Sequence, residues 1–404
     1  MRKPSLLIIF LTVFIDLVGF GLIFPLLPIY SQNFGASGFM IGAIIAVYSL
    51  MQFIFAPIWG RLSDRIGRRP ILLISTGCAS ISYMIFAFGS GMEGSVALWV
   101  ILISRLFAGI CGANISVAQA YIADITPPEK RSARMGLIGM AFGLGFVFGP
   151  ALGGFSIKWF GLMGPGWVAA VLTGLNFLWV AFMLPESWKP STEPVMPRPR
   201  LAQFTHTMSN PTMGLLIGIF FLATFCFASF ETTIGLLVSK NFNLEISTGK
   251  GAETIAYLIS YCAILGALVQ GGAIGKLVKK MGEPKLIASS LIIAAVGMAL
   301  IPYLHTWGFL LIGLGVFSIG SQLTRPPVFG MISMLTSANE QGTTMGVAQS
   351  IGSLARILGP MFAAMTFEKH PSFPYLVCAA LSFMTGVLAW RLLKRPVHAS
   401  EQAV

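Results

Sequence analysis

Apolar runs long enough to cross a lipid bilayer follow one another along almost the whole chain. A helix that spans the hydrocarbon core needs about 20 predominantly apolar residues, and about twelve such runs lie between charged or Pro/Gly-rich breaks. The predicted spans are 6–29, 38–59, 71–89, 96–121, 135–157, 165–184, 212–238, 252–274, 286–304, 307–334, 342–366 and 373–391. The sequence therefore predicts an all-α integral membrane protein with twelve transmembrane helices.

Composition excludes the main alternative, a soluble globular protein. Hydrophobic residues make up 55% of the 404 residues, charged residues only 10%, and the mean hydropathy is +0.82. Such a chain lacks the polar surface of a soluble domain. The first apolar run is too long for the core of a secretory signal peptide and lacks a small-residue cleavage site, so it is predicted to be the first membrane helix.

Cysteine and histidine usage gives no sign of a metal site. The five Cys lie in apolar segments without metal-like spacing, and the four His fall in loops, at segment edges or in the tail. The sequence contains no Gly-Lys-Ser/Thr phosphate-binding loop. We therefore expect no metal, cofactor or ATP. A membrane enzyme or sensor is disfavoured because clusters of His, Asp and Glu and a soluble domain are missing.

The distribution of Lys and Arg predicts the orientation of the chain. With the N-terminus inside, 19 of the 26 basic residues fall in cytoplasmic segments and four in outer loops. Because cytoplasmic loops are enriched in Lys and Arg, both termini are predicted to be cytoplasmic, in a multi-pass protein of the cytoplasmic (inner) membrane. The same bias explains the net charge of +12 without a nucleic-acid partner.

A Pro-rich segment and an internal repeat divide the chain into two halves. Residues 185–211 contain six Pro and are predicted to be a cytoplasmic linker between six-helix bundles at 1–184 and 212–391, with a cytoplasmic tail at 392–404. Gly60 and Gly67 recur 215 residues later as Gly275 and Gly282, and Asp16 falls on Glu231 at the same offset. Two pseudo-symmetric bundles are therefore expected.

The most charged stretch is GRLSDRIGRRP, from Gly60 to Pro70, which we predict to be a short turn between the second and third helices. Gly60 and Gly67 would allow a tight turn, and Asp64 would face the N-terminus of a neighbouring helix. The basic side chains there are expected to pair with carboxylates or lipid phosphates; they are Arg65, Arg68 and Arg69. The second copy carries Lys279 at the position of Asp64, so orientation alone does not explain this acid.

These motifs resemble those of the major facilitator superfamily. GRLSDRIGRRP resembles the motif between helices 2 and 3 of that family, and the sequence from Pro185 to Ser187 resembles the end of its helix 6. Residues 16–28 and 50–73 are similar to tetracycline/proton antiporters and related drug-efflux proteins. The resemblance implies that Asp64 holds the two halves together on the cytoplasmic side while the site opens outward.

The predicted fifth helix carries glycines at four-residue spacing, including Gly145, Gly149 and Gly153. Small residues at this spacing let another helix approach closely, and Pro150 adds a possible bend. Ordinary helix packing suffices to explain the pattern. The stretch from Gly149 to Gly154, Gly-Pro-x-x-Gly-Gly, also resembles the motif of antiporters in this family, which implies a gating role for Gly149 and Pro150 and export as the direction of transport.

Ionisable residues within the spans are candidates for proton coupling, because a charge at mid-bilayer costs about 2.5–3.5 kcal/mol or more. Asp16 lies near the middle of helix 1, and Glu231 is its counterpart in helix 7. Arg105, followed by Gly109 and Gly112, resembles the buried arginine of the family. A structural Asp16–Arg pair is the alternative.

Further polar residues within the spans are candidates for substrate binding. Arg325 and Arg356 either pair with acids across the bundle or bind an anionic substrate group. The uncharged candidates line a cavity or form hydrogen bonds between helices; they are Gln52, Asn114, Gln119, Gln270 and Gln322. Asp16 and Glu231 complete the candidate substrate site.

Together these patterns predict a proton-coupled antiporter that exports an amphiphilic drug, tetracycline-like or multidrug, or a related organic compound by alternating access. Its partners would be protons, a small organic substrate and the lipid bilayer, and we expect a monomer. Acidic and His positions expected of tetracycline antiporters on helices 3, 8 and 9 are missing, which leaves the substrate open. The alternative function is a proton-coupled uptake symporter for a sugar or organic acid.

Overall fold

The computed structural model describes residues 4–27, 30, 34–189, 200–244 and 249–394, and every regular element in these ranges is a helix. The long helices of the first half are α1 (Leu6–Ile23), α3 (Gly38–Ile66), α4 (Arg68–Ser90), α5 (Gly94–Cys111), α6 (Ile115–Asp124), α7 (Pro128–Phe160) and α8 (Gly164–Met183). Those that follow are α9 (Arg200–Ser209), α10 (Pro211–Phe242), α11 (Gly249–Leu268), α12 (Ile274–Met281), α13 (Glu283–Leu300), α14 (Trp307–Met334), α15 (Gln341–Phe367) and α16 (Phe373–Leu392).

Short helical turns extend or join several of these helices. They are η1 (Phe24–Leu26), η2 (Gly112–Asn114), η3 (Gly161–Met163), the π-helical η4 (Val269–Ala273), η5 (Ile301–Tyr303) and η6 (Ala338–Glu340). One turn, η2, joins α5 to α6 and another, η4, joins α11 to α12, so that each pair makes one continuous crossing. In the described part of the chain, two numbered helices can therefore belong to the same membrane crossing.

The number of crossings agrees with the sequence prediction of twelve. Eleven continuous helical stretches are long and apolar enough to span a membrane, and the longest, Pro128–Met183, has 56 residues. At 1.5 Å per residue it would be more than twice as long as the hydrocarbon core is thick. It reverses direction at Gly161, which has a φ of +65°, and so contains two crossings, α7 and α8.

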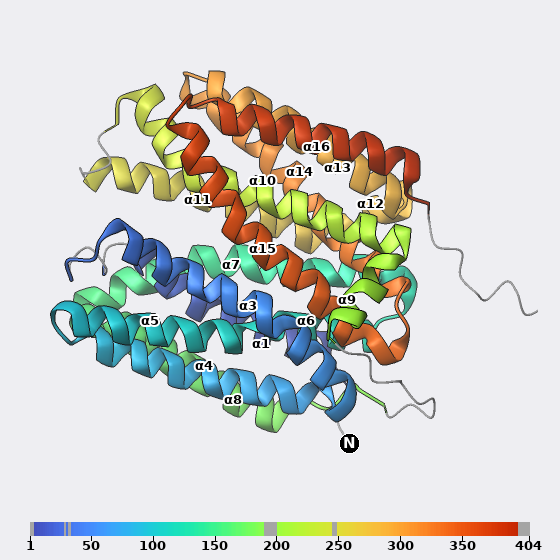
Figure 1. Ribbon diagram of the computed structural model, residues 1–404, viewed down its shortest axis with the longest axis horizontal. Coiled ribbons are helices and arrows are strands. Elements are labelled where there is room, and N and C mark those ends of the chain that lie inside the picture. The colour runs from blue at the N-terminus through green and yellow to red at the C-terminus, as the bar shows by residue number, and fades with distance from the viewer. Residues whose placement is uncertain (1–3, 28–29, 31–33, 190–199, 245–248, 395–404) are drawn as a thin grey trace, which may run out of the picture.

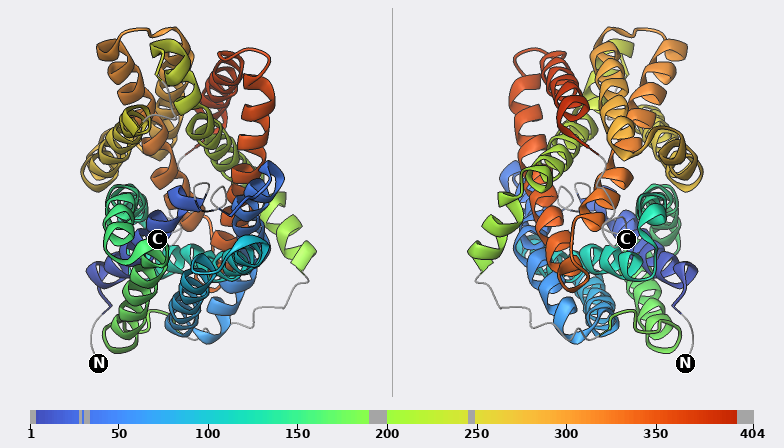
Figure 2. Two further views of the ribbon diagram at one scale, coloured as in Figure 1. Left: turned by 90° about the vertical axis from the view of Figure 1, so that its left-hand side faces the viewer. Right: turned by 90° about the vertical axis from the view of Figure 1, so that its right-hand side faces the viewer.

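The twelve crossings form two bundles, as predicted. Figure 2 shows them as one group of helices coloured blue to green and another coloured yellow to red. Within the N-terminal bundle, α1 packs on α7 and α4 packs on α5 and α8; within the C-terminal bundle, α13 packs on α14 and α16, and α10 packs on α15. The short helix α9 lies in the linker segment and packs on α10 (Figure 1).

The internal repeat appears in the backbone at two glycines. A single residue, Gly67 with φ +101°, separates α3 from α4, and Gly282 with φ +77° separates α12 from α13 in the same way. The prediction of a turn over the whole stretch from Gly60 to Pro70 is therefore wrong. The backbone stays helical up to Ile66 and resumes at Arg68, because charged side chains end the membrane span without ending the helix.

The two bundles meet mainly along α3 and α7 of the N-terminal bundle. Helix α15 packs along α3, and α14 and α11 pack along α7. We call the end of the molecule that contains Gly67, Gly282 and the start of the linker segment the linker end. The cross-bundle hydrogen bonds between described residues come from the linker end and the middle of these helices.

Candidate functional site

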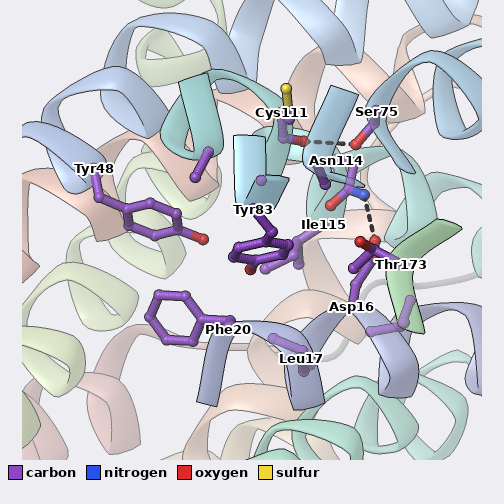
Figure 3. Close-up of a pocket in the computed structure, with 14 residues that line it drawn as sticks. Asp16, Leu17, Phe20, Tyr48, Ser75, Tyr83, Cys111, Asn114, Ile115 and Thr173 are labelled. Carbon is purple, nitrogen blue, oxygen red and sulfur yellow. Dashed lines mark hydrogen bonds between the residues drawn. The ribbon is translucent and has the colours of Figure 1, made fainter. Parts of the chain in front are cut away.

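A small cavity lies inside the N-terminal bundle beside the middle of α1. Its lining includes Asp16, Tyr48, Tyr83 and Asn114, which come from α1, α3, α4 and η2 (Figure 3). The cavity volume is about 40 Å³, whereas pockets for drug-sized molecules measure about 300–1,000 Å³. It has room for water next to Asp16, but not for an amphiphilic drug.

The Asp16 carboxylate is held by two amide groups. The Nδ2 atom of Asn114 donates to one carboxylate oxygen over 2.9 Å, and the Nδ2 atom of Asn176 in α8 donates to the other over 2.8 Å. Asn176 also donates to the carbonyl oxygen of Thr12, which fixes the orientation of its amide. None of the salt bridges among the described residues involves Asp16. A proton can therefore bind there without breaking an ion pair.

Arg105 is a buried cation whose neighbours are aromatic. Its side chain is 1% exposed, and the Cζ atom lies 5.5 Å from the ring centroid of Tyr83 and 5.2 Å from that of Phe86. The Nε and Nη2 atoms have no hydrogen-bond partner in the described part of the chain. Since Tyr83 also lines the cavity, Arg105 lies behind one cavity wall. It forms no salt bridge with Asp16.

A second group of charges lies in the middle of the C-terminal bundle. Glu231 on α10 interacts electrostatically with both Arg325 on α14 and Arg356 on α15. The Cζ atom of Arg325 lies 5.3 Å from the ring centroid of Phe227. All three charged residues are half-buried. The structure thus brings together three candidates that are far apart in the sequence.

Arg356 connects this group to the N-terminal bundle. Its Nη2 atom donates to Oε1 of Gln52 on α3 over 2.9 Å, and Gln52 donates to the hydroxyl oxygen of Tyr48 over 3.0 Å. Because Tyr48 lines the cavity beside Asp16, a continuous polar path runs from the C-terminal charges to the wall of this cavity. Toward the linker end, Gln349 donates to Oε1 of Gln119 across the same interface over 3.1 Å.

The remaining amide candidates pair within the C-terminal bundle. Gln270 in η4 donates from Nε2 to the carbonyl oxygen of Gln322 over 3.0 Å and to its Oε1 over 2.6 Å. Gln270 also packs against Gly136 and Gly139 of α7, where a Cβ atom would overlap it. The two glutamines therefore join η4 to α14, and Gln270 also packs on α7 of the N-terminal bundle.

Asp64 binds the N-terminus of α15. One carboxylate oxygen accepts a hydrogen bond from the backbone N–H of Gly342 over 2.9 Å, and the other accepts from the backbone N–H and hydroxyl of Thr343 over 2.7 and 2.6 Å. N–H groups in the first turn of a helix lack partners within the helix and favour negative charge. This contact crosses from one bundle to the other at the linker end.

Arg68 supports Asp64 from within the N-terminal bundle. Its fully buried guanidinium binds Asp64 over 2.5 Å and Asp124 of α6 over 3.0 Å. Glu186, in the linker segment, accepts hydrogen bonds from the backbone N–H groups of Arg68 and Arg69 over 2.9 and 3.0 Å at the N-terminus of α4. Arg69 also donates to the carbonyl oxygen of Ala181. By contrast, Arg65 is exposed.

Glycines allow the close contact of the bundles at the linker end. A Cβ atom at Gly60 would overlap the backbone of Gly342, and one at Gly346 would meet the carbonyl oxygen of Ala56 at 2.5 Å. Gly60 therefore allows α3 to pack closely against α15, and it does not form the turn that the sequence predicted. Also between the bundles, Ser132 of α7 donates to Oε1 of the buried Glu283 at the start of α13 over 3.2 Å.

The glycine stripe of α7 is divided between two neighbours. Gly145, Gly149 and Gly153 lie against the α1 backbone, and a Cβ atom at Gly149 would overlap Gly21 and Leu22. Gly143 instead lies against Ala263 of α11 in the other bundle. Pro150 lies inside the continuous helix. The Gly149–Pro150 pair therefore belongs to the packing of α1 on α7.

Sequence reasoning missed three polar residues that hold the predicted ones. Asp16 is bound by Asn176, and Arg68 is bound by Asp124. The backbone at the start of α4 is bound by Glu186. Asn176 was detectable as a polar residue within an apolar span, and Asp124 as an acid at the end of one. The resemblance singled out the motif around Glu186, but its contact with α4 links residues 118 apart in sequence.

Comparisons with known proteins agree on one family. The protein-family model described as "Major Facilitator Superfamily" matches residues 9–360 of this chain, and a second match covers residues 271–404. The class C tetracycline resistance protein of Escherichia coli is 32% identical over 381 residues, covering 92% of each chain. The multidrug resistance protein 2 of Bacillus subtilis is 28% identical over 93% of this chain and 92% of its own.

A solved structure supports the same architecture. The crystal structure titled human organic anion transporter MFSD10 (TETRAN) superposes with a TM-score of 0.83 and covers 96% of this chain and 100% of its own. The sequence identity is 24%. At this identity the likeness bears on the fold alone.

Proposed function

Because the chain belongs to the major facilitator superfamily, whose members are transporters and not enzymes, we propose that it exports an amphiphilic drug or related organic compound in exchange for protons. The names of the tetracycline and multidrug resistance relatives support this substrate class. The excess of basic residues at the linker end supports a cytoplasmic location for that end and for both termini. The working unit is a monomer in the cytoplasmic membrane.

The observation that carries the proton step is the environment of Asp16. Its carboxylate accepts two amide hydrogen bonds beside a water-sized cavity and takes part in no salt bridge with any residue that the structure describes. Protonation removes the charge and takes away one of the acceptor positions, so that the amide contacts of α1 with η2 and α8 change. Asp16 is thus the proton carrier, Arg105 the fixed cation that excludes a second positive charge nearby, and Glu231 the second proton site.

Alternating access uses the contacts at the linker end. Asp64, supported by Arg68, binds the start of α15 while the bundles are closed on the cytoplasmic side. Separation of Gly60 from Gly342 would open that side. In this proposal, the arrangement in which Asp64 binds α15 is the cytoplasmically closed state, in which substrate and protons exchange with the outside.

Transport in inverted membrane vesicles tests this function. With an acidic lumen, an antiporter accumulates tetracycline or ethidium as protons leave, and each proton crossing 100 mV supplies about 2.3 kcal/mol, or about fifty-fold accumulation. We expect D16N to lose this accumulation but to retain exchange of labelled for unlabelled substrate, because the latter needs no net proton movement. Unchanged accumulation in D16N would contradict the coupling role.

The rival uptake symporter predicts the opposite gradient dependence. In right-side-out vesicles with an acidic exterior, a symporter takes substrate in together with protons, whereas the proposed antiporter does not. Measuring both orientations with the same probes therefore separates the two functions.

A further inference from the structure

The charged cluster of the C-terminal bundle has more positive than negative groups. Arg325 and Arg356 both interact electrostatically with the carboxylate of Glu231, although neither forms a salt bridge with it. Other acidic residues that the structure describes in this bundle lie at or near helix ends; they are Glu253, Glu283, Glu340 and Glu368. With Glu231 ionised, the described residues of this bundle leave one positive charge uncompensated within its membrane-spanning helices, where an unpaired charge is costly.

Among the residues that the structure describes, neither guanidinium forms a salt bridge with another acid. Arg356 donates to neutral acceptors, Gln52 and Ser353, over 2.9 and 2.8 Å, and Arg325 lies over the face of Phe227. A guanidinium has five N–H donors in a planar fork that matches an oxyanion. Both arginines are half-buried, although they lie in the middle of their helices, and the Arg356–Gln52 contact places that guanidinium at the interface between the bundles.

Aromatic rings lie next to this cluster on the N-terminal bundle. Tyr48 accepts a hydrogen bond from the same Gln52 that binds Arg356. The ring of Phe20 lies 5.0 Å from that of Tyr48, and the rings of Phe24 and Phe146 lie 5.0 and 5.9 Å from Phe20. The four rings, which we call the aromatic group, are half-buried. They offer apolar faces beside an uncompensated positive charge.

We infer that Arg325 and Arg356 bind an anionic group of the substrate, with the aromatic group receiving its apolar ring system. The substrate class, which rests on the proposed transport function, is then an aromatic organic acid such as a carboxylate, sulfonate or phenolate. Glu231 offsets one of the two positive charges, so the site favours a monoanion. A charge-assisted bidentate contact supplies the affinity and fixes the orientation.

Two probes that differ only in the anionic group test this inference. Equilibrium binding of 8-anilinonaphthalene-1-sulfonate and of neutral N-phenyl-1-naphthylamine is measured on the full chain in lipid nanodiscs, with binding to empty nanodiscs subtracted. We expect the sulfonate to bind at least tenfold more tightly. R325Q and R356Q should each weaken sulfonate binding about tenfold and leave binding of the neutral probe within twofold, whereas E231Q should not weaken sulfonate binding.

Control variants separate recognition from general charge and folding effects. K240Q removes an exposed positive charge from the same helix as Glu231 and should leave both affinities unchanged. R325K and R356K keep the charge and should retain intermediate sulfonate affinity, with size-exclusion profiles checking that each variant is folded. Equal affinity for the two probes, equal weakening of both by the arginine variants, or binding of neither probe would overturn the inference.

This binding experiment uses no proton gradient, so its outcome is independent of coupling and direction. If sulfonate recognition holds but the vesicle assay shows no proton-driven export, the proposed function fails and the anion site stands. If export is observed but wild-type protein does not distinguish the probes, the inference on substrate class alone is wrong.

Discussion

Thr343 donates both its backbone N–H and its hydroxyl group to one carboxylate oxygen of Asp64, over 2.7 and 2.6 Å. The contact joins the end of α3 in one bundle to the first turn of α15 in the other. Through this contact a single side chain stabilises one arrangement of the two bundles. Because hydrogen bonds to a charged group contribute about 1.5–3 kcal/mol each, its loss should shift the balance between closed and open states measurably.

We predict that D64N opens the linker end. The neutral amide loses the charge and keeps only one acceptor oxygen, so the closed state should become at least about tenfold less favoured. Distances between spin labels placed on the two bundles at this end measure the shift. K279Q is the matched control, since Lys279 is exposed and lies 215 residues on in the repeat. Distance distributions in D64N that match those of the unmodified chain would contradict the prediction.

G60A should impair closure, whereas G42A should not. Both glycines lie in α3, and both substitutions raise helix propensity by about 1 kcal/mol. A Cβ atom at Gly60 would overlap the backbone of Gly342, but one at Gly42 would meet no described atom within 4 Å. We expect G60A to transport at least about tenfold more slowly and G42A to stay within about twofold. The measurement is the initial rate of transport in vesicles. Equal rates for the two variants would show that transport does not require close helix contact at Gly60.

Removing the Asn176 amide should weaken proton-driven transport. In N176A the buried carboxylate of Asp16 loses one of its two donors, which costs about 1–3 kcal/mol, so uptake should fall about tenfold. T173V is the control about one turn earlier on α8, because the Thr173 hydroxyl donates to the carbonyl oxygen of Ala169 and not to Asp16. If both variants transport equally well, Asn176 does not position Asp16.

E186Q should lower the stability of the N-terminal bundle. Glu186 receives two backbone N–H groups at the start of α4, and a carboxylate at a helix N-terminus contributes about 0.5–2 kcal/mol. The thermal unfolding midpoint should fall by about 1–3 °C. E93Q is the control, since exposed Glu93 occupies the N-cap of α5 without a side-chain capping bond. If E186Q and E93Q change the thermal unfolding midpoint equally, the effect comes from the change in net charge and not from loss of the helix cap.

Much of the fold was predictable because the bilayer imposes a strong local pattern. Each span is recognised from its own residues, and the repeat of Gly67 at Gly282 is visible by simple comparison. The stretch from Gly60 to Pro70 was read as a turn because hydropathy marks where the membrane ends and not where the backbone stops being helical. Its charged residues continue α3 for almost two turns beyond the last apolar run.

The sequence predicted which residue types belong to the candidate site, but not which of these residues contact one another. Buried Asp, Glu and Arg stand out in an apolar chain whatever they contact. Which of them meet depends on how separate helices pack: Arg356 and Gln52 are 304 residues apart, and Asn176 and Asp16 are 160 apart. The expected alternative of an Asp16–Arg pair gave way to two amides, a choice that no local pattern encodes.

The sequence by itself determined that the chain crosses a membrane about twelve times, in two related halves, with a few polar residues placed inside. Those conclusions follow from the free-energy cost of putting charged groups and unpaired backbone in hydrocarbon, which each segment reveals on its own. Only the tertiary structure decided that Asp64 meets the start of α15, that two asparagines hold Asp16, and that Glu231 interacts electrostatically with two arginines. Those contacts depend on the packing of helices that are distant in the sequence, where glycines allow close approach.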